Sequence, residues 1–334
     1  MATVAASAMF ASNRGAFASG ESLTIVDVED EQQITGSLNT VSITATGSIY
    51  SPTDTALFVD DQGGAGAFSN TITNAGEIYG EDESGIEFDT DGAIGSNVIS
   101  NSGVIDALNE AIALGSSQGD VSSNTINNTG AIFSQSDDGI RLATGGSGAT
   151  VSSNSISNSG TIESDEEAIE LNSDSGAVVG NSVSNSGTLY SGGNDAIYVY
   201  GDEGIISNSI TNSGVIESDV YGAVNFNSDD ANTVSNTIVN EAEGRFVANG
   251  TGVEFTTATG AISGNTITNH GIFDVMDHGV MLSSYEGDIT ANVIENTGQI
   301  LADDGDRGIY FYTGEDGYAN ISGNSISNSG VIVA

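Results

Sequence analysis

One nine-residue phrase, Asn-Ser-Ile-Ser-Asn-Ser-Gly-Thr-Ile at 154–162, returns with small changes along nearly the whole sequence. Its glycine recurs at Gly76, Gly103, Gly130, Gly160, Gly187, Gly214, Gly271, Gly298 and Gly330, with a degenerate copy at Gly47 and a stretched copy at Gly244. Neighbouring copies are mostly 27 residues apart (103 − 76 = 27), and the longest regular step is 32 residues (330 − 298 = 32). A fixed period of this size is typical of proteins built by stacking one structural unit on the next.

The phrase alternates with period two, which is the pattern of a β-strand with one buried face. A second apolar pair, such as Gly139-Ile140-Arg141-Leu142, precedes the next phrase in most repeats. These windows are too short for helices, so each repeat is expected to hold three short strands joined by polar turns. A coil that lays each strand beside its copy in the next turn explains the constant period. The sequence therefore predicts an all-β parallel β-helix.

Two asparagine positions recur inside the phrase. One comprises Asn97, Asn124, Asn154, Asn181, Asn208, Asn236, Asn265, Asn292 and Asn324, and the other Asn74, Asn101, Asn128, Asn158, Asn185, Asn212, Asn240, Asn269, Asn296 and Asn328. A buried amide is costly unless it is paired. Identical amides stacked roughly 4.8 Å apart can bond to each other, so we expect two internal asparagine ladders.

The Ile-x-Asn-x-Gly-x-Ile phrase followed by Ala/Gly-Ile-x-Leu resembles the repeats of autotransporter-type passenger domains and related bacterial surface β-helix proteins. The resemblance covers the chain from about residue 36 onward and is specific for fold rather than activity. It implies a right-handed helix located outside the bacterial cell or on its surface.

Residues 36–334 are expected to form a single β-helix of about eleven coils, each of 27 to 32 residues. Residues 1–35 lack the clear phrase and are expected to form an N-terminal cap or assembly segment, because the first coil of a solenoid needs cover. The sequence ends within a coil. We therefore expect either that the chain is cut from a longer protein or that another copy covers this last coil, giving a homo-oligomer that stacks end to end.

The composition excludes several partners. The formal net charge is −42, with four arginines, no lysine and no cysteine. Nucleic acid and anionic membrane surfaces are excluded because binding them requires positive charge. No stretch approaches 18 apolar residues, so no membrane span is expected. An acidic, cysteine-free chain fits an exported protein in saline or calcium-containing surroundings.

Acidic turns precede the Ala/Gly-Ile strand in several repeats. Stacking would bring their carboxylates to one edge, where they would recruit cations that accept oxygen ligands. The expected calcium edge comprises Asp137, Asp138, Glu166, Glu167 and Asp195. A solvated edge without a metal is the alternative interpretation, because the nonapeptide of calcium-binding toxin repeats is not present.

Other chemistry finds less support in the sequence. Paired carboxylates on neighbouring coils, as used by glycoside-cleaving enzymes, are not apparent among the outward strand residues, so we expect no catalysis. Tyr198, Tyr310 or an insertion at Gly314 could line a groove for surface glycans. A Ser/Thr array on the central strand could bind ice or pair sideways with another surface.

The leading hypothesis is a non-enzymatic rod: a surface filament subunit, stalk or adhesin segment. A carbohydrate-binding or carbohydrate-cleaving β-helix is the alternative.

Overall fold

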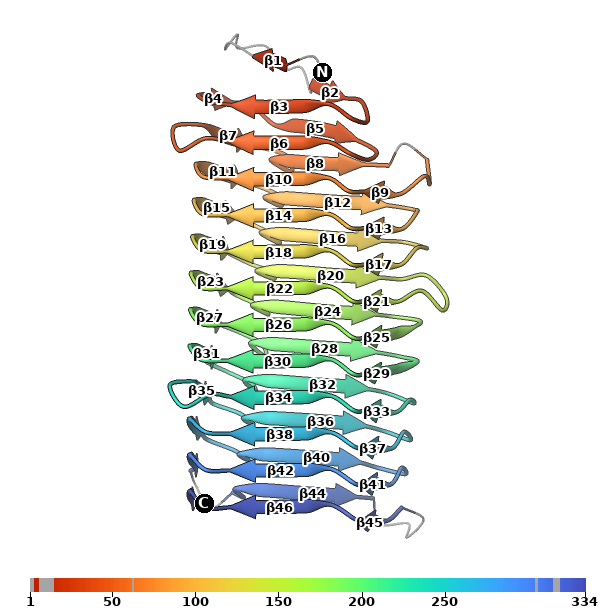
Figure 1. Ribbon diagram of the computed structural model, residues 1–334, viewed down its shortest axis with the longest axis vertical. Coiled ribbons are helices and arrows are strands. Elements are labelled where there is room, and N and C mark those ends of the chain that lie inside the picture. Colours follow the sequence, from red (N-terminus) through yellow and green to blue (C-terminus); the bar gives the residue numbers. More distant parts are fainter. Residues whose placement is uncertain (1–2, 6–14, 62, 304–305, 315–318) are drawn as a thin grey trace.

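The chain winds into a β-solenoid whose strands stack in four parallel sheets (Figure 1). The structure is a computed structural model that describes residues 3–5, 15–61, 63–303, 306–314 and 319–334. All secondary structure in these residues is β, which confirms the predicted all-β class, and they hold no helix capable of crossing a membrane. Successive coils wind in a right-handed sense (Figure 1), as strand connections between parallel neighbours do almost without exception.

We name the four sheets A to D. Sheet A has thirteen strands: β1 (Thr3–Ala5), β3 (Ser22–Ile25), β6 (Thr40–Ile43), β10 (Thr71–Asn74), β14 (Val98–Asn101), β18 (Thr125–Asn128), β22 (Ser155–Asn158), β26 (Ser182–Asn185), β30 (Ser209–Asn212), β34 (Thr237–Asn240), β38 (Thr266–Asn269), β42 (Val293–Asn296) and β46 (Ser325–Asn328). Sheet B has twelve: β2 (Gly15–Phe17), β5 (Gln32–Thr35), β8 (Leu57–Asp60), β12 (Ile86–Thr90), β16 (Ile112–Ser116), β20 (Ile140–Thr144), β24 (Ile169–Ser173), β28 (Ile197–Gly201), β32 (Val224–Ser228), β36 (Val253–Thr257), β40 (Val280–Ser284) and β44 (Ile309–Thr313).

Sheet C also has twelve strands: β4 (Val28–Glu29), β7 (Ser48–Ser51), β11 (Glu77–Gly80), β15 (Val104–Ala107), β19 (Ala131–Ser134), β23 (Thr161–Ser164), β27 (Thr188–Ser191), β31 (Val215–Ser218), β35 (Arg245–Ala248), β39 (Ile272–Val275), β43 (Gln299–Ala302) and β47 (Val331–Val333). Sheet D has ten: β9 (Ala67–Phe68), β13 (Ile94–Gly95), β17 (Val121–Ser122), β21 (Val151–Ser152), β25 (Ala177–Val179), β29 (Gly204–Ile206), β33 (Thr233–Val234), β37 (Ile262–Ser263), β41 (Ile289–Thr290) and β45 (Ile321–Ser322).

The number of strands per coil differs from the prediction. A full coil has four strands, one in each sheet, rather than three, and the ten strands of sheet D mark ten such turns. The unpredicted corner lies between sheets D and A, where Ser96, Ser123 and Ser153 adopt φ of 57 to 58°. This left-handed conformation bends the chain and separates two or three residues into a strand of their own.

The described part of residues 1–35 joins the same stack. Strands β3, β4 and β5 pair in parallel with β6, β7 and β8. Leu23, Ile25 and Ile34 are 3%, 1% and 1% exposed, so the apolar core continues through this segment. Residue 35 is therefore not a break in the sheets, and a capping role for the segment stays a prediction.

The inside of the coil is filled by aliphatic side chains, aromatic pairs and the two predicted asparagine ladders. Phe226 stacks on Phe255 with 4.8 Å between ring centroids, and Phe246 stacks on Phe273 at 4.7 Å. In the first ladder, which the structure extends to Asn39 and Asn70, each side-chain amide donates to the next asparagine oxygen at 2.9 to 3.1 Å. In the second, the corresponding distance is 2.8 to 2.9 Å.

The last coil exposes apolar side chains that are buried in the coils before it. Ile321 and Ile326 are 48% and 52% exposed. Their counterparts one coil earlier, Ile289 and Ile294, are 0% and 1% exposed, because the final coil covers them.

Candidate functional site

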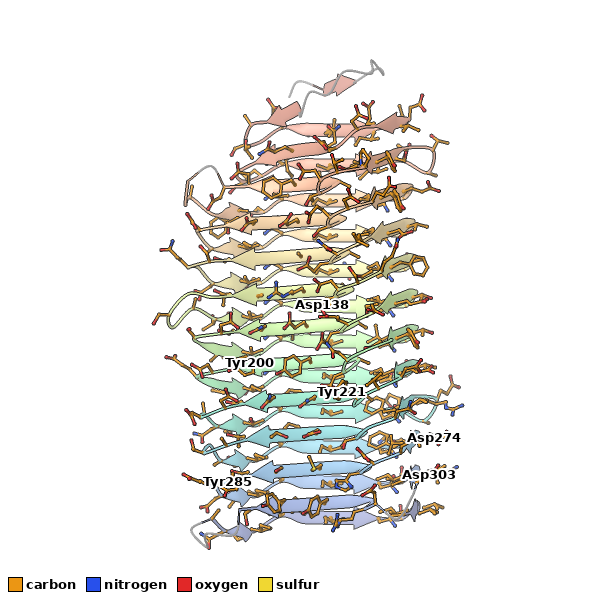
Figure 2. The ribbon with its side chains drawn as sticks, turned by 180° about the vertical axis from the view of Figure 1, so that it is seen from behind. Asp138, Tyr200, Tyr221, Asp274, Tyr285 and Asp303 are labelled. Atoms are coloured by element: carbon orange, nitrogen blue, oxygen red, sulfur yellow. The ribbon has the colours of Figure 1, made fainter. Side chains whose placement is uncertain are left out.

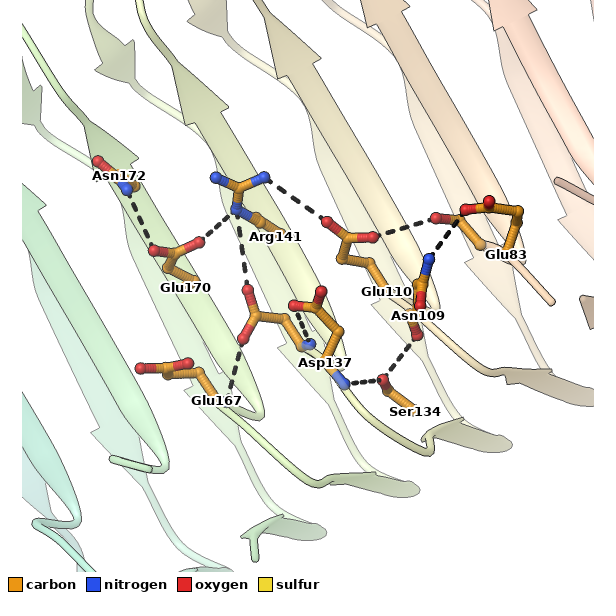
Figure 3. Close-up of polar contacts among 11 residues, drawn as sticks. Glu83, Asn109, Glu110, Ser134, Asp137, Arg141, Glu167, Glu170 and Asn172 are labelled. Carbon is orange, nitrogen blue, oxygen red and sulfur yellow. Dashed lines mark hydrogen bonds and ion pairs between the residues drawn. The ribbon is translucent and has the colours of Figure 1, made fainter. Parts of the chain in front are cut away.

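A cluster of carboxylates and one arginine lies midway along the rod, where sheet C turns into sheet B (Figures 2 and 3). The turns before β20 and β24 supply its acids, because the residue ahead of each Gly/Ala-Ile pair occupies the same place in successive coils. Asp137, Asp138 and Glu166 each place a carboxylate oxygen within 4.8 Å of the others. The structure thus brings together three of the five residues predicted to form a calcium edge.

Asp138 is the most enclosed member, at 2% exposed. Its Oδ1 accepts a hydrogen bond from the backbone N–H of Glu167 at 3.0 Å, which ties one coil to the next. Burial raises the pKa of Asp138 far above its usual range, and the Glu170 and Glu167 carboxylates raise this pKa further. Burial and these neighbouring carboxylates therefore favour the protonated form of Asp138.

Arg141 provides the positive charge of the cluster. Its Nε lies 2.5 Å from Glu170 Oε2 and 3.9 Å from Asp138 Oδ2, and its Nη1 lies 3.6 Å from Glu110 Oε1. The guanidinium thus faces carboxylates from three successive coils (Figure 3). The carboxylates together raise the pKa of Arg141 despite its burial, so it stays charged.

The outer carboxylates experience net repulsion. Burial and the Glu110 carboxylate raise the pKa of Asp137. Burial and the Asp137 and Asp165 carboxylates raise the pKa of Glu166, which is exposed. A divalent cation held between Asp137 and Glu166 would relieve this repulsion, whereas Arg141 already balances the charge on the inner side.

Glu167 and Asp195 do not join the three clustered carboxylates. Glu167 Oε2 accepts a hydrogen bond from Asn194 Nδ2 at 3.2 Å. Asp195, in the following coil, accepts the backbone N–H of Gly222 at 2.7 Å and Asn225 Nδ2 at 2.9 Å. Asp195 thus links coils in the same way as Asp138. Burial raises its pKa to about 6, partly opposed by the hydrogen bonds from Asn225 and Gly222.

The tyrosines predicted to line a glycan groove are far apart. Tyr198 lies in β28 and Tyr310 in β44, which are four strands apart in sheet B, or roughly 19 Å. Tyr198 stacks on Tyr200 with ring centroids 6.4 Å apart, whereas Tyr310 contacts Arg307 and His278. Residues 315–318 of the predicted Gly314 insertion lie outside the described part of the chain.

A groove that the sequence analysis missed lies over sheet C. It has a volume of about 430 Å³ and is lined in part by Phe133, Tyr190, Glu163, Asp106 and Asp165. Phe133 and Tyr190 flank Glu163 in the register of β19, β23 and β27. The Tyr190 hydroxyl donates to Asp219 at 2.7 Å, which raises the pKa of Tyr190 to about 12. The available signal was the shared strand position of Phe133, Glu163 and Tyr190 in consecutive repeats.

Comparisons with protein-family models, with curated proteins and with solved structures found no match.

Proposed function

We propose that this protein is a non-enzymatic structural rod of the bacterial cell surface: a stalk, adhesin segment or filament subunit of the autotransporter-passenger kind. The observation that carries the proposal is the unbroken register of the solenoid. Every coil pairs with the next in parallel, and two amide ladders run through the interior. A body built in this way resists bending and spans distance, which are the properties of a spacer.

The use of the buried acids supports a structural rather than a catalytic role. Asp138 and Asp195, with raised pKa values, accept backbone N–H groups of the following coil. Perturbed pKa values arise in structural networks as well as in active sites. Here the enclosed carboxyl of Asp138, at 2% exposed, offers little access for a substrate.

The composition supports a location outside the cell. A chain with 46 acidic and four basic residues repels itself unless salt or divalent cations screen it. Calcium at the outer carboxylates, Asp137 and Glu166, would serve as such a counter-ion, with the weak affinity of extracellular calcium modules, on the order of 10⁻⁴ to 10⁻³ M. End-to-end stacking onto the apolar last coil would lengthen the rod.

Electron microscopy of the purified protein with and without calcium tests the rod proposal. We expect straight, unbranched particles of uniform width, whose length distribution extends in steps of one molecule if copies stack end to end. Compact or irregular particles would contradict the rod. Particles of a single length under all conditions would contradict end-to-end stacking but not the rod itself.

A carbohydrate-binding function is the second candidate, and the groove over sheet C favours it. Aromatic faces at Phe133 and Tyr190 and the carboxylate of Glu163 are the groups that pack against sugar rings and accept their hydroxyls. A glycan array with the intact protein and with Phe133→Ala tests this function. Binding that Phe133→Ala abolishes would support it, and an array without hits would remove it.

A further inference from the structure

Few charged residues of this protein lie on sheet A. In the ten stretches that run from each sheet D strand through sheet A to the following glycine, 67–76 to 321–330, only three of the 46 acidic residues occur: Glu241, Glu243 and Glu295. None of the four arginines lies there. The remaining 43 acids (46 − 3 = 43) lie elsewhere in the chain, chiefly on sheets B and C and their turns. Sheet A is therefore a neutral face on a strongly anionic molecule.

The neutral face is flat, periodic and rich in hydroxyl groups. Its outward side chains come from alternate positions of each strand, as in β26, where Ser182 and Ser184 are exposed and Val183 and Asn185 are buried. From β3 to β46 these side chains are Ser, Thr, Val, one Asn and Glu295. In Figure 1 this sheet faces the viewer, and the longer loops extend from the sides of the rod rather than across it.

We infer that sheet A is the surface through which two copies of this protein pair side by side, with their acidic faces pointing away from each other. The distribution of charge favours a second copy as the partner and sheet A as the contact face. Two molecules with a net charge of −42 repel each other through any other side, whereas hydroxyl groups can donate to and accept from one another without added charge. The arrangement is a two-fold, isologous contact.

The repeat favours a second copy over other occupants. Each coil offers only small side chains, so useful binding requires the same weak contact to recur along the whole rod. A second copy has the same spacing between coils, so each of its coils can lie opposite a coil of the first copy along the whole rod. Ice or a crystalline polysaccharide stays in step only if its lattice spacing matches, because a small difference adds up from coil to coil.

The area is sufficient for a stable pair. Twelve of the thirteen strands, β3 to β46, present described side chains. At about 4.8 Å per strand and 3.3 Å per residue the face measures roughly 55 Å by 13 Å, or about 700 Å². That is close to the area per partner of a standard-size protein interface, about 800 Å².

Sedimentation equilibrium of the full chain at moderate ionic strength tests the inference. We expect a mass of twice 33.7 kDa that depends on concentration. Ser157→Asp with Ser184→Asp places two carboxylates in the centre of the face, where they oppose those of the partner. We expect these two substitutions to raise the dissociation constant of the dimer at least about tenfold. Added salt should reverse part of this increase, because it screens the repulsion.

The matched control adds the same charge to the acidic side, with Ser136→Asp and Tyr221→Asp at exposed turn positions. This control should dimerise with nearly the same dissociation constant as the parent protein. Ser157→Thr with Ser184→Thr should also leave the dissociation constant unchanged. Circular dichroism checks that each variant folds.

A monomeric parent protein would overturn the inference. A dimer that Ser157→Asp with Ser184→Asp leaves intact would also overturn it. So would a monomer that binds ice or insoluble polysaccharide through this face. The substitutions on sheet A distinguish this contact from end-to-end stacking, which they should leave unchanged.

Discussion

Asn154 donates its side-chain amide to the Oδ1 atom of Asn181 at 3.0 Å, and the backbone N–H of Asn154 donates to the same oxygen at 2.9 Å. The second amide hydrogen of Asn154 bonds to the carbonyl of Val121 at 2.8 Å, in the preceding coil. One buried side chain therefore joins three coils, and its repetition supplies every amide in the ladder with partners.

Replacing Asn154 by alanine should cost at least about 3 kcal/mol of the free energy of unfolding, because several buried groups of Asn124, Val121 and Asn181 lose their partner at once. Urea denaturation followed by circular dichroism measures the loss. Ser157→Ala, at an exposed position of the same strand, is the control and should change stability little. Equal, small effects of both substitutions would show that the ladder contributes little to stability.

Asp195 should make the protein less stable as the pH rises. Its pKa is about 6 in the folded chain and near 3.8 when unfolded, so the folded state holds the proton more tightly. This favourable contribution is complete below about pH 3.8 and is lost as the pH increases through about 6, on the order of 3 kcal/mol in total.

Asp195→Asn should remove this pH dependence and stabilise the protein at neutral pH. The new amide can still accept the N–H of Gly222, and it can donate to Asn225 Oδ1, a buried atom without a hydrogen-bond partner. Thermal unfolding at a series of pH values provides the comparison. Parallel pH profiles for the parent and the variant would contradict the role assigned to Asp195.

Arg141→Gln should destabilise the protein, and the loss should be greater at pH 8 than at pH 5. Without the guanidinium, the carboxylates of Glu110 and Glu170 lose their positive partner, and protonation is the remaining way to lower the cost of their charge. Arg245→Gln is the matched control, since its ion pair with Asp274 is about half exposed on both sides. Equal losses for the two variants would mean that the enclosure of the carboxylates around Arg141 does not matter.

Calcium should bind weakly at the outer carboxylates and raise the melting temperature once its concentration approaches Kd, with a logarithmic increase above Kd. Asp137→Asn with Glu166→Gln should abolish the calcium effect and, by removing repulsion, raise stability in its absence. Titration calorimetry and thermal unfolding measure the two effects. A calcium response that survives in the double variant would place the cation elsewhere.

The features that recur in every repeat were predictable from the sequence. The parallel winding and both ladders follow from residues such as Asn154 and Asn158, because identical spacing places identical groups above one another. The meeting of Asp138 with Glu166 follows from the same logic, since one coil separates their turns. The corner at Ser153 was missed because serine gives no sign of a positive φ, although Gly180 and Gly264 occupy the same place in other coils.

Features that depend on side-chain conformation were not predictable in the same way. Asp195 stays apart from the acidic cluster because its carboxylate turns toward the Gly222 N–H. The approach of Arg141 to Glu170 depends on a strand register across 29 residues and on the direction of a long side chain. The groove between Phe133 and Tyr190 combines residues 57 positions apart (190 − 133 = 57).

Hydrogen exchange of asparagine side-chain amides, measured by NMR on protein labelled with ¹⁵N-asparagine, tests the stacked coil most directly. Ladder members such as Asn154 and Asn158 should retain their amide hydrogens far longer than the outward Asn127, because exchange at a buried amide requires the coils to separate. Two distinct populations are the expected result. A single population in which every side-chain amide exchanges at the rate of an exposed group would contradict the account.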